Sequence, residues 1–247
     1  MGRQLTVEVT SSVQSGIISG LTDTIQPRST DGGEHSGDSS SHDDSGASTT
    51  TQPAGSFNPD VPATCISTPE NPGQDGRVGI TTGQVWDAID RAAAEAQKNG
   101  TVKNGVAVAA HLPAGTTGVA LDRAALDKLI SSGGRSFRLS FDGVAMSFDL
   151  AALKEIAAQT SGTLTFGAKK GAGLAGEALA AIGTRPAYEL AVTFQKDGQT
   201  VPVASFGAGR VAVGVSYAPA ANEQSGSMYA VYADGGSAVW LDHSCYD

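Results

Sequence analysis

The chain has 247 residues, and its 25 acidic and 16 basic side chains give a formal net charge of −9. Residues 1–78 carry seven of these net negative charges, whereas residues 79–247 are close to neutral. Nucleic-acid binding depends on clustered Lys and Arg that neutralise phosphates, so this balance argues against a nucleic-acid partner. No run of about 18 apolar residues is present, and the sequence therefore predicts no membrane span.

The first 27 residues contain one short strand pattern. Leu5, Val7 and Val9 alternate with polar residues, which is the period of a strand with one buried face. Residues 1–27 are too short to bury a core, so we expect them to be a remnant of a preceding module or unstructured. They also lack the continuous apolar stretch of a secretory signal peptide.

Residues 28–78 have the composition of a disordered linker. Ser, Thr, Gly and Asp dominate the first half, several prolines follow, and Phe57 is the only aromatic residue before Trp86. Such a segment cannot bury enough apolar surface to offset its ordering entropy. We therefore expect a flexible linker ahead of one folded unit at residues 79–247.

A helix is predicted at the start of the folded unit. Thr81 and Gln84 have the spacing of a capping box, and apolar residues then recur every three or four positions. Asn99-Gly100 is a typical helix end. Trp86 lies beside the apolar stripe, so we expect it in the core.

An internal repeat with a spacing of 27 residues follows. Asp122-Arg-Ala-Ala-Leu-Asp-Lys-Leu-Ile is echoed by Asp149-Leu-Ala-Ala-Leu-Lys-Glu-Ile-Ala, and each copy predicts a strand, a helix and another strand. An Asp at the N-cap accepts the first-turn N–H groups and suits the helix dipole. We therefore expect Asp122 and Asp149 to be structural N-caps, in a sheet with its helices on one face.

The last third of the chain predicts antiparallel strands. Apolar residues alternate with polar ones from residue 187 onward, and Asp197-Gly198 and Asp234-Gly235-Gly236 are typical hairpin turns. The predicted fold class is α+β: two strand–helix–strand repeats and a C-terminal half built as an antiparallel sheet or sandwich, preceded by a disordered linker.

Two motifs match patterns that are found in enzymes, but the sequence around each motif argues against a catalytic role. Gly171 to Gly176 match the dinucleotide-binding pattern G-x-G-x-x-G, but the helix after them is too short for the crossover of that fold. Asp242-His243-Ser244 joins three residue types of a hydrolytic triad, but sequence neighbours rarely supply its geometry. A flexible connector and a surface turn are the better interpretations.

The sequence does not favour a metal site either. His35 and His42 lie among aspartates in the expected linker, where no rigid backbone would preorganise a site. Two cysteines are too few for a structural zinc site or a disulfide scaffold. We therefore expect a protein that is not an enzyme, with no catalytic residues, no cofactor and no metal site.

Six blocks stand in a characteristic order within residues 79–247: Ile80-Thr-Thr-Gly-Gln-Val-Trp-Asp-Ala-Ile, Asn104-Gly-Val-Ala-Val, Phe148-Asp-Leu-Ala-Ala-Leu-Lys-Glu-Ile, Ile182-Gly-Thr-Arg-Pro-Ala-Tyr, Ser205-Phe-Gly-Ala-Gly-Arg-Val and Ala230-Val-Tyr…Val239-Trp-Leu. In order and spacing they resemble an α+β module of exported Gram-positive bacterial surface proteins, which often accompanies S-layer homology domains and bacterial Ig-like repeats. The family has no established catalytic residues to carry over. Its modules close with one more strand, so the resemblance implies a C-terminally truncated module in which Ala238–Leu241 lack a partner strand.

The resemblance implies an extracellular or cell-wall location, with a signal peptide outside this chain. We expect a non-catalytic structural or adhesive module that contacts a cell-wall or host glycan or protein; its oligomeric state stays open. The alternative is a glycan-binding accessory domain of a secreted enzyme, which would need exposed aromatic residues such as Trp86, Trp240 or a few Tyr. A hydrolase is a third hypothesis.

Export would place Cys65 and Cys245 under oxidising conditions, where two cysteines can close one bridge. A bridge would tie the end of the linker to the C-terminus. Two free thiols are the alternative, because the sequence does not show whether the two Cα atoms come within bonding range.

Overall fold

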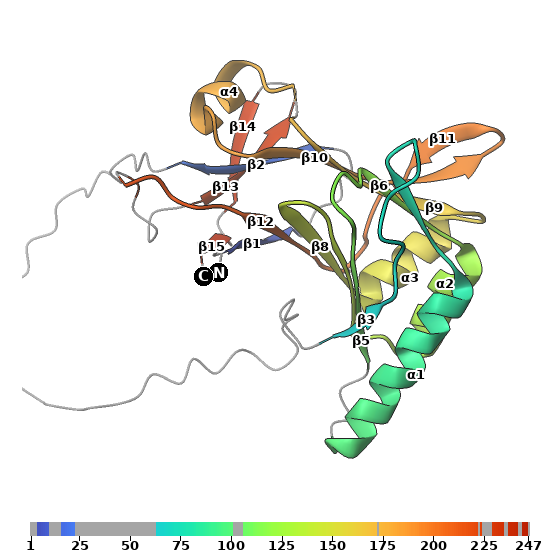
Figure 1. The fold of residues 1–247 in the computed structure, drawn as a ribbon. Helices are drawn as coiled ribbons and strands as arrows, with labels where there is room; N and C mark the ends of the chain where they lie inside the picture. Colours follow the sequence, from blue (N-terminus) through green and yellow to red (C-terminus); the bar gives the residue numbers. More distant parts are fainter. Residues whose placement is uncertain are drawn as a thin grey trace, which may run out of the picture.

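The computed structural model describes residues 4–9, 16–22, 63–100, 106–171, 173–221, 223, 229–234, 237–241 and 244–246. Most of the expected linker, residues 28–62, lies outside the described residues. Two β-sheets and four helices form the described part of the chain, so the predicted α+β class is confirmed (Figure 1).

The seven-stranded sheet contains, in spatial order, β15 (Ser244–Tyr246), β1 (Gln4–Val9), β12 (Val211–Ser216), β8 (Val144–Asp149), β7 (Ser136–Ser140), β5 (Ala107–His111) and β3 (Thr64–Ile66). The eight-stranded sheet contains β14 (Ser237–Leu241), β13 (Tyr229–Asp234), β2 (Gly16–Thr22), β10 (Ala187–Lys196), β9 (Leu164–Lys170), β6 (Gly118–Leu121) and β4 (Arg77–Ile80), and β11 (Gln199–Pro202) pairs with β10. Strand pairs β3–β5, β5–β7 and β4–β6 are parallel, and the other recorded pairs are antiparallel.

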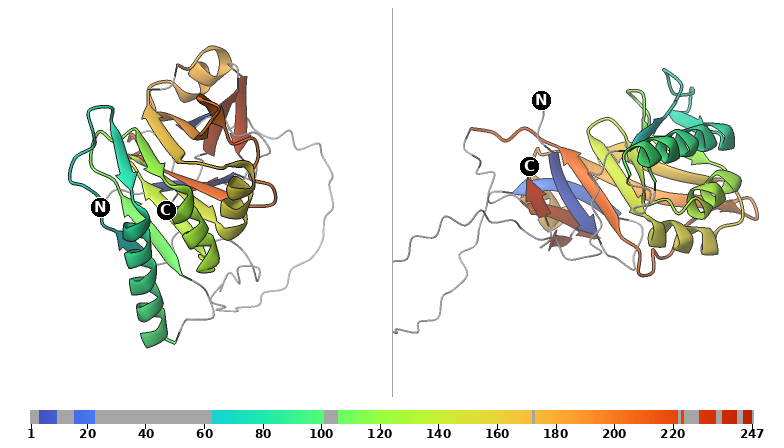
Figure 2. Two further views of the ribbon diagram at one scale, coloured as in Figure 1. Left: turned by 90° about the vertical axis from the view of Figure 1, so that its right-hand side faces the viewer. Right: turned by 90° about the horizontal axis from the view of Figure 1, so that it is seen from below.

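The helices are α1 (Thr82–Lys98), α2 (Arg123–Ser131), α3 (Leu150–Gln159) and α4 (Gly176–Ile182). Helices α1, α2 and α3 lie together on one side of the molecule, whereas α4 lies apart from them beside β13 and β14 (Figure 1, Figure 2). The first three helices and both sheets share one apolar core, and α4 covers a second, smaller cluster.

The internal repeat is present, but its units join two sheets. The first unit runs from β6 in the eight-stranded sheet through α2 to β7 in the seven-stranded sheet, and the second runs back through β8, α3 and β9. The expectation of a single sheet with helices on one face is therefore wrong. Sequence periodicity predicts each strand, but it carries no information about which sheet the strand joins.

The N-terminal strands complete both sheets. β1 pairs with β12 and β15, and β2 pairs with β10 and β13, so each lies between strands from the C-terminal half. This differs from the expectation that residues 1–27 are unstructured or belong to a preceding module. The folded unit also begins before residue 79, because β3 and β4 place residues 64–66 and 77–80 in the two sheets.

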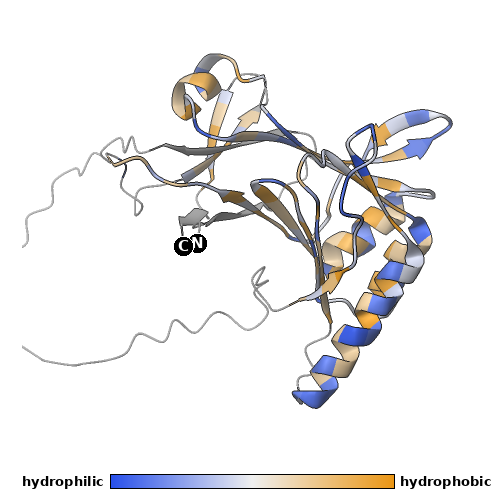
Figure 3. Ribbon diagram, in the orientation of Figure 1, coloured by the Kyte–Doolittle hydropathy of each residue, from blue (hydrophilic) through white to orange (hydrophobic). Residues whose placement is uncertain are grey.

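Helix α1 begins as its sequence predicts. Gln84 N–H donates to Thr81 Oγ1 at 3.3 Å, and Thr81 N–H donates to Gln84 Oε1 at 2.8 Å, which completes the capping box. The helix ends at Lys98 with Asn99 as its C-cap, and one of its faces is apolar while the other is polar (Figure 3). The buried residues of this helix are Val85, Ala88, Ile89 and Ala92.

The two repeat helices differ in their N-caps. Asp149 Oδ1 accepts the N–H of Ala152 at 2.7 Å, as predicted. Asp122 occupies the N-cap position of α2, but its carboxylate makes no capping hydrogen bond and instead accepts the hydroxyl of Thr163 at 3.3 Å. The expected cap function is therefore confirmed for Asp149 and wrong for Asp122.

This difference predicts unequal costs for one substitution. Asp149→Ala should lower the free energy of unfolding by about 1 kcal/mol, the usual contribution of an N-cap hydrogen bond. Asp122→Ala should lower the free energy of unfolding by clearly less, because no N–H group in the first turn of α2 loses a side-chain acceptor. Urea denaturation of both variants measures the two costs, and equal losses would contradict the assignment.

The two cysteines lie at opposite edges of the seven-stranded sheet. Cys65 is on β3 and Cys245 is on β15, which are the two ends of the strand order. Six strand spacings of about 4.8 Å separate them by about 29 Å along the sheet, whereas a disulfide needs Cα atoms within about 7 Å. Cys65 is a free, exposed thiol. The structure thus contradicts the Cys65–Cys245 bridge.

We therefore expect two free thiols in the folded chain, even after export to an oxidising compartment. Alkylation of the unreduced, denatured protein followed by intact-mass measurement should show two added groups. A mass with no added group, which gains two after reduction, would contradict the strand order.

Candidate binding surface at the edge of the eight-stranded sheet

Exposed apolar side chains gather where the eight-stranded sheet ends. Among the residues that the structure describes, β14 is the edge strand of this sheet and pairs only with β13. Trp240 on β14 is 43% exposed, Tyr229 on β13 is 40% exposed and Leu179 on α4 is 50% exposed. Tyrosine and tryptophan combine large apolar area with a hydrogen-bonding group, which suits them to contact surfaces.

The strand register places Trp240 on the side of the sheet that faces α4. Val231 of β13 is opposite Trp240, and Val231 is buried against α4. Tyr229 begins β13 two residues before Val231, and the register of β13 with β2 shifts between these two residues. We call Tyr229, Trp240 and Leu179 the aromatic edge surface.

Helix α4 is seated on the sheet by a small apolar cluster of its own. Ala178 and Ile182 of the helix pack with Val231 and Ala233 of β13, and Leu174 and Ala238 border them. Burying these residues turns Leu179 outward. The three residues of the aromatic edge surface therefore lie on elements that pack against one another: α4, β13 and β14.

A largely buried ion pair ties the chain after α4 to the chain before β13. Arg185 Nη2 lies 2.7 Å from Glu223 Oε1, and Arg185 Nε donates to the same oxygen at 2.8 Å. Tyr217 Oη and Ala220 N–H donate to Glu223 Oε2 at 2.5 and 2.7 Å. Burial alone would raise the pKa of Glu223, but these hydrogen bonds and the guanidinium together hold it below its ordinary value. The Glu223 carboxylate thus links Arg185, which follows α4, to Tyr217 and Ala220, which follow β12.

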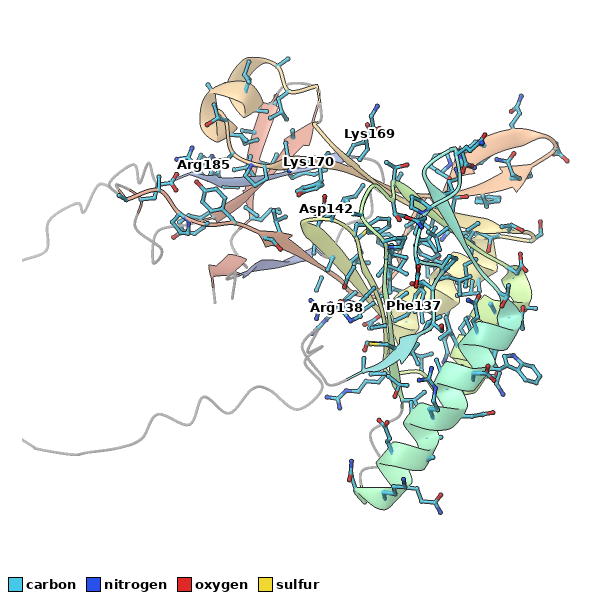
Figure 4. The ribbon with its side chains drawn as sticks, in the orientation of Figure 1. Phe137, Arg138, Asp142, Lys169, Lys170 and Arg185 are labelled. Carbon is cyan, nitrogen blue, oxygen red and sulfur yellow. The ribbon has the colours of Figure 1, made fainter. Side chains whose placement is uncertain are left out.

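A second buried polar contact lies between the sheets. Tyr188 of β10 is 2% exposed, and its hydroxyl donates to the carbonyl of Asp142 in the β7–β8 turn at 3.3 Å. Burial, and then the nearby Asp142 carboxylate, raise the pKa of Tyr188 above its ordinary value. Figure 4 labels Asp142 at this turn. The Tyr188 hydroxyl therefore joins β10 of one sheet to the β7–β8 turn of the other.

Trp86 is a second exposed tryptophan, and its expected core position is wrong. Its side chain is 49% exposed, and Lys128 Nζ of α2 lies 4.4 Å above its ring centroid. Val85 and Ile89 turn toward the core instead. The cation–π contact to Lys128 comes from a residue 42 positions away, so no pattern near Trp86 in the sequence predicts it.

The remaining motifs of the sequence analysis either form a connection or lie partly or wholly outside the described residues. The glycine-rich stretch joins β9 to the seven-residue helix α4, as expected for a connector. Asp242, His243, His35 and His42 lie outside the described residues. Among the residues that the structure describes, no group of three His, Cys, Asp or Glu is placed to hold a metal ion.

Comparison of the chain with protein-family models, with curated proteins and with solved structures gives no match. No helix in the described ranges has the length and apolar character needed to cross a membrane.

Proposed function

We propose that the chain is a non-catalytic module of a bacterial cell-surface protein, located outside the cell or in the cell wall, with an adhesive role. The observation that carries the proposal is the aromatic edge surface. Its three exposed residues lie on neighbouring elements, and tryptophan and tyrosine dominate the binding energy at many protein contact sites. The resemblance of residues 79–247 to exported surface modules supports the location.

The alternative is a glycan-binding accessory domain of a secreted enzyme. Such a domain needs exposed aromatic side chains, and the exposure of Trp240 and Trp86 supplies them. The two tryptophans lie on different elements, β14 and α1, so each would serve a separate contact. Trp240 has a second exposed aromatic residue, Tyr229, on the neighbouring strand β13, and Trp240 is therefore the stronger candidate.

Binding of the full chain to isolated Gram-positive cell walls and to a glycan array tests both functions. We expect Trp240→Ala to weaken binding about thirtyfold, which corresponds to the roughly 2 kcal/mol lost at a contact hot spot. Retention on cell walls without a glycan signal supports the adhesive module with a protein partner, whereas a glycan signal that needs Trp240 supports the alternative.

Trp86→Ala is the matched control, because it removes an equally exposed tryptophan from another surface. Equal losses for the two variants would contradict the assignment to the aromatic edge surface. A broad hydrolase screen tests the non-catalytic part: turnover that disappears on substitution of a single Asp or Glu would overturn it.

A further inference from the structure

Two successive apolar side chains of β14 are exposed on opposite faces of the eight-stranded sheet. Val239 is 48% exposed and Trp240 is 43% exposed. Trp240 is opposite Val231, which packs against α4. Val239 is opposite Tyr232, which packs against the main core on the other face. A group that covered one face of the sheet would bury one of these two side chains, whereas a strand beside β14 would contact both.

The backbone of β14 is also available to such a strand. Within the described ranges, β14 is hydrogen-bonded to β13 and to no other strand. In an antiparallel pair, every second residue directs its N–H and C=O groups away from the neighbouring strand, so an edge strand offers these groups to a further strand. The chain that follows β14 does not take this place in the described part, because β15 pairs with β1 in the other sheet.

β14 lacks the features that block strand addition at the other edges of the two sheets. Soluble proteins protect edge strands with charged residues, with proline or by keeping the strand short. Strand β4 carries the exposed Arg77, β11 ends at Pro202, and β3 and β15 have three residues each. Strand β14, Ser237–Leu241, has five residues and contains neither a charged residue nor a proline. It is therefore the edge best suited to accept another strand.

The charge of the chain around β14 indicates the chemistry of that strand. Residues 221–247 contain four acidic residues and no Lys or Arg, and Asp234 and Asp242 flank β14 in the sequence. A second copy of β14 would bring two acidic segments together, and like charges that face each other across strands are destabilising. An extended segment with a basic residue at each end would be attracted instead.

We propose that the aromatic edge surface binds an extended peptide segment of a partner protein, which adds to β14 as a further strand of the eight-stranded sheet. The segment has apolar side chains that contact Val239 on one face and Trp240 on the other, and Lys or Arg at its ends. Main-chain hydrogen bonds provide the affinity in this mode of recognition, and the alternate side chains provide the specificity. The inference rests on the proposed function, because it names the class of partner that this surface takes.

Titration of the full chain with synthetic peptides tests the proposal. The first peptide alternates valine and threonine over about seven residues, within the usual length of a strand, and has lysine at both ends. The second has glutamate at both ends, and the third has proline in place of the central residue of the first. We expect the lysine-ended peptide to bind about tenfold more tightly than either of the others, because the acidic chain repels glutamate and proline interrupts the ladder. No measurable binding of the lysine-ended peptide, or equal affinity for all of them, would overturn the proposal.

Amide hydrogen exchange separates an added strand from a ligand that only stacks on Trp240. When the lysine-ended peptide is bound, the β14 amides that point away from β13 should exchange more slowly, because each donates to the added strand. Binding that leaves the exchange of these amides unchanged would show contact through the side chain alone, and it would overturn the added strand.

Variants of Val239 provide a second test, because this residue lies on the face opposite Trp240. Val239→Lys should abolish binding of the lysine-ended peptide, since it places a cation on the edge strand, whereas Val239→Ile should retain it. Ala94→Lys adds the same charge to an exposed position of α1 and is the control, with binding equal to that of the parent. Equal urea midpoints show that the variants are folded. Undiminished binding by Val239→Lys would contradict the proposal.

The cell-wall assay distinguishes a failure of this inference from a failure of the proposed function. We expect Val239→Lys to lose cell-wall binding together with Trp240→Ala. Loss with Trp240→Ala alone would leave the adhesive function intact and overturn strand addition. A parent that binds the lysine-ended peptide but not cell walls would overturn the adhesive function and support strand addition. A dimer of the parent in analytical ultracentrifugation that Val239→Lys dissociates would assign the edge to a second copy, and this result would also overturn the inference.

Discussion

Phe166→Ala should lower the free energy of unfolding by about 3–5 kcal/mol, the usual cost of removing a fully buried phenylalanine. Phe166 has no exposed surface, and its ring makes edge-to-face contacts with Phe148 at 5.2 Å and Phe137 at 6.0 Å between centroids. Phe166 belongs to the eight-stranded sheet and its two partners to the seven-stranded sheet. The substitution therefore opens a cavity where the sheets meet.

Phe206→Ala is the matched control. Its ring contacts Phe148 at 6.0 Å, but the residue is only partly buried at the margin of the same core. Urea denaturation should show a clearly smaller loss for this variant. Domains of this kind have about 5–15 kcal/mol of stability in total, so Phe166→Ala should also reduce the folded population at elevated temperature. Equal losses of unfolding free energy for Phe166→Ala and Phe206→Ala would contradict the central place of Phe166 in the core.

Gly209→Ala should lower the free energy of unfolding by about 3 kcal/mol, which is the upper end of the usual range for overpacking. A Cβ at this position would fall on the backbone nitrogen and Cα of Ala152 in the first turn of α3. The same loop is hydrogen-bonded to the helix start, because Asp149 N–H donates to the Arg210 carbonyl at 3.1 Å. Backbone cannot move aside as a flexible side chain can, so the loop or the helix must shift.

Gly79→Ala makes the same change where there is space. Gly79 is exposed on β4, and a Cβ there meets no atom within 4 Å. We expect this variant to be neutral or more stable by about 0.4–1 kcal/mol, because alanine restricts the unfolded chain. Thermal unfolding of Gly209→Ala and Gly79→Ala measures the difference in stability between them. If both variants were as stable as the parent, the loop at Gly209 would be able to shift without cost, which would contradict the prediction.

The features that local sequence determines were predictable. The capping box of Thr81 and Gln84 needs only residues within one helical turn. The β10–β11 hairpin follows from Asp197-Gly198, whose φ angles of 52° and 76° are those that a two-residue hairpin turn requires. Strand alternation likewise located β10, β12 and β14 to within a few residues.

The features that depend on distant partners were not predictable. Pairing of β1 with β12 joins residues about 200 positions apart, and no local pattern records it. The same limit applies to the candidate site: the Asp234-Gly235-Gly236 turn signal predicts the strand that holds Trp240, but not that this strand ends the sheet. Trp86 was misplaced for a related reason, since Lys128 of another helix provides its contact.

The antiparallel pairing of β1 with β15 has a mechanical consequence. Leu5 is opposite Tyr246, so the two ends of the described chain lie side by side (Figure 1). A polypeptide that continued past both ends would carry this unit as a side branch and gain almost no length from it. Tension applied through both ends would separate β1 from β15 one residue pair at a time, starting at the loaded ends, before any force reached the core. Such a geometry suits a module that holds a partner out from a stalk better than one that sets the length of the stalk.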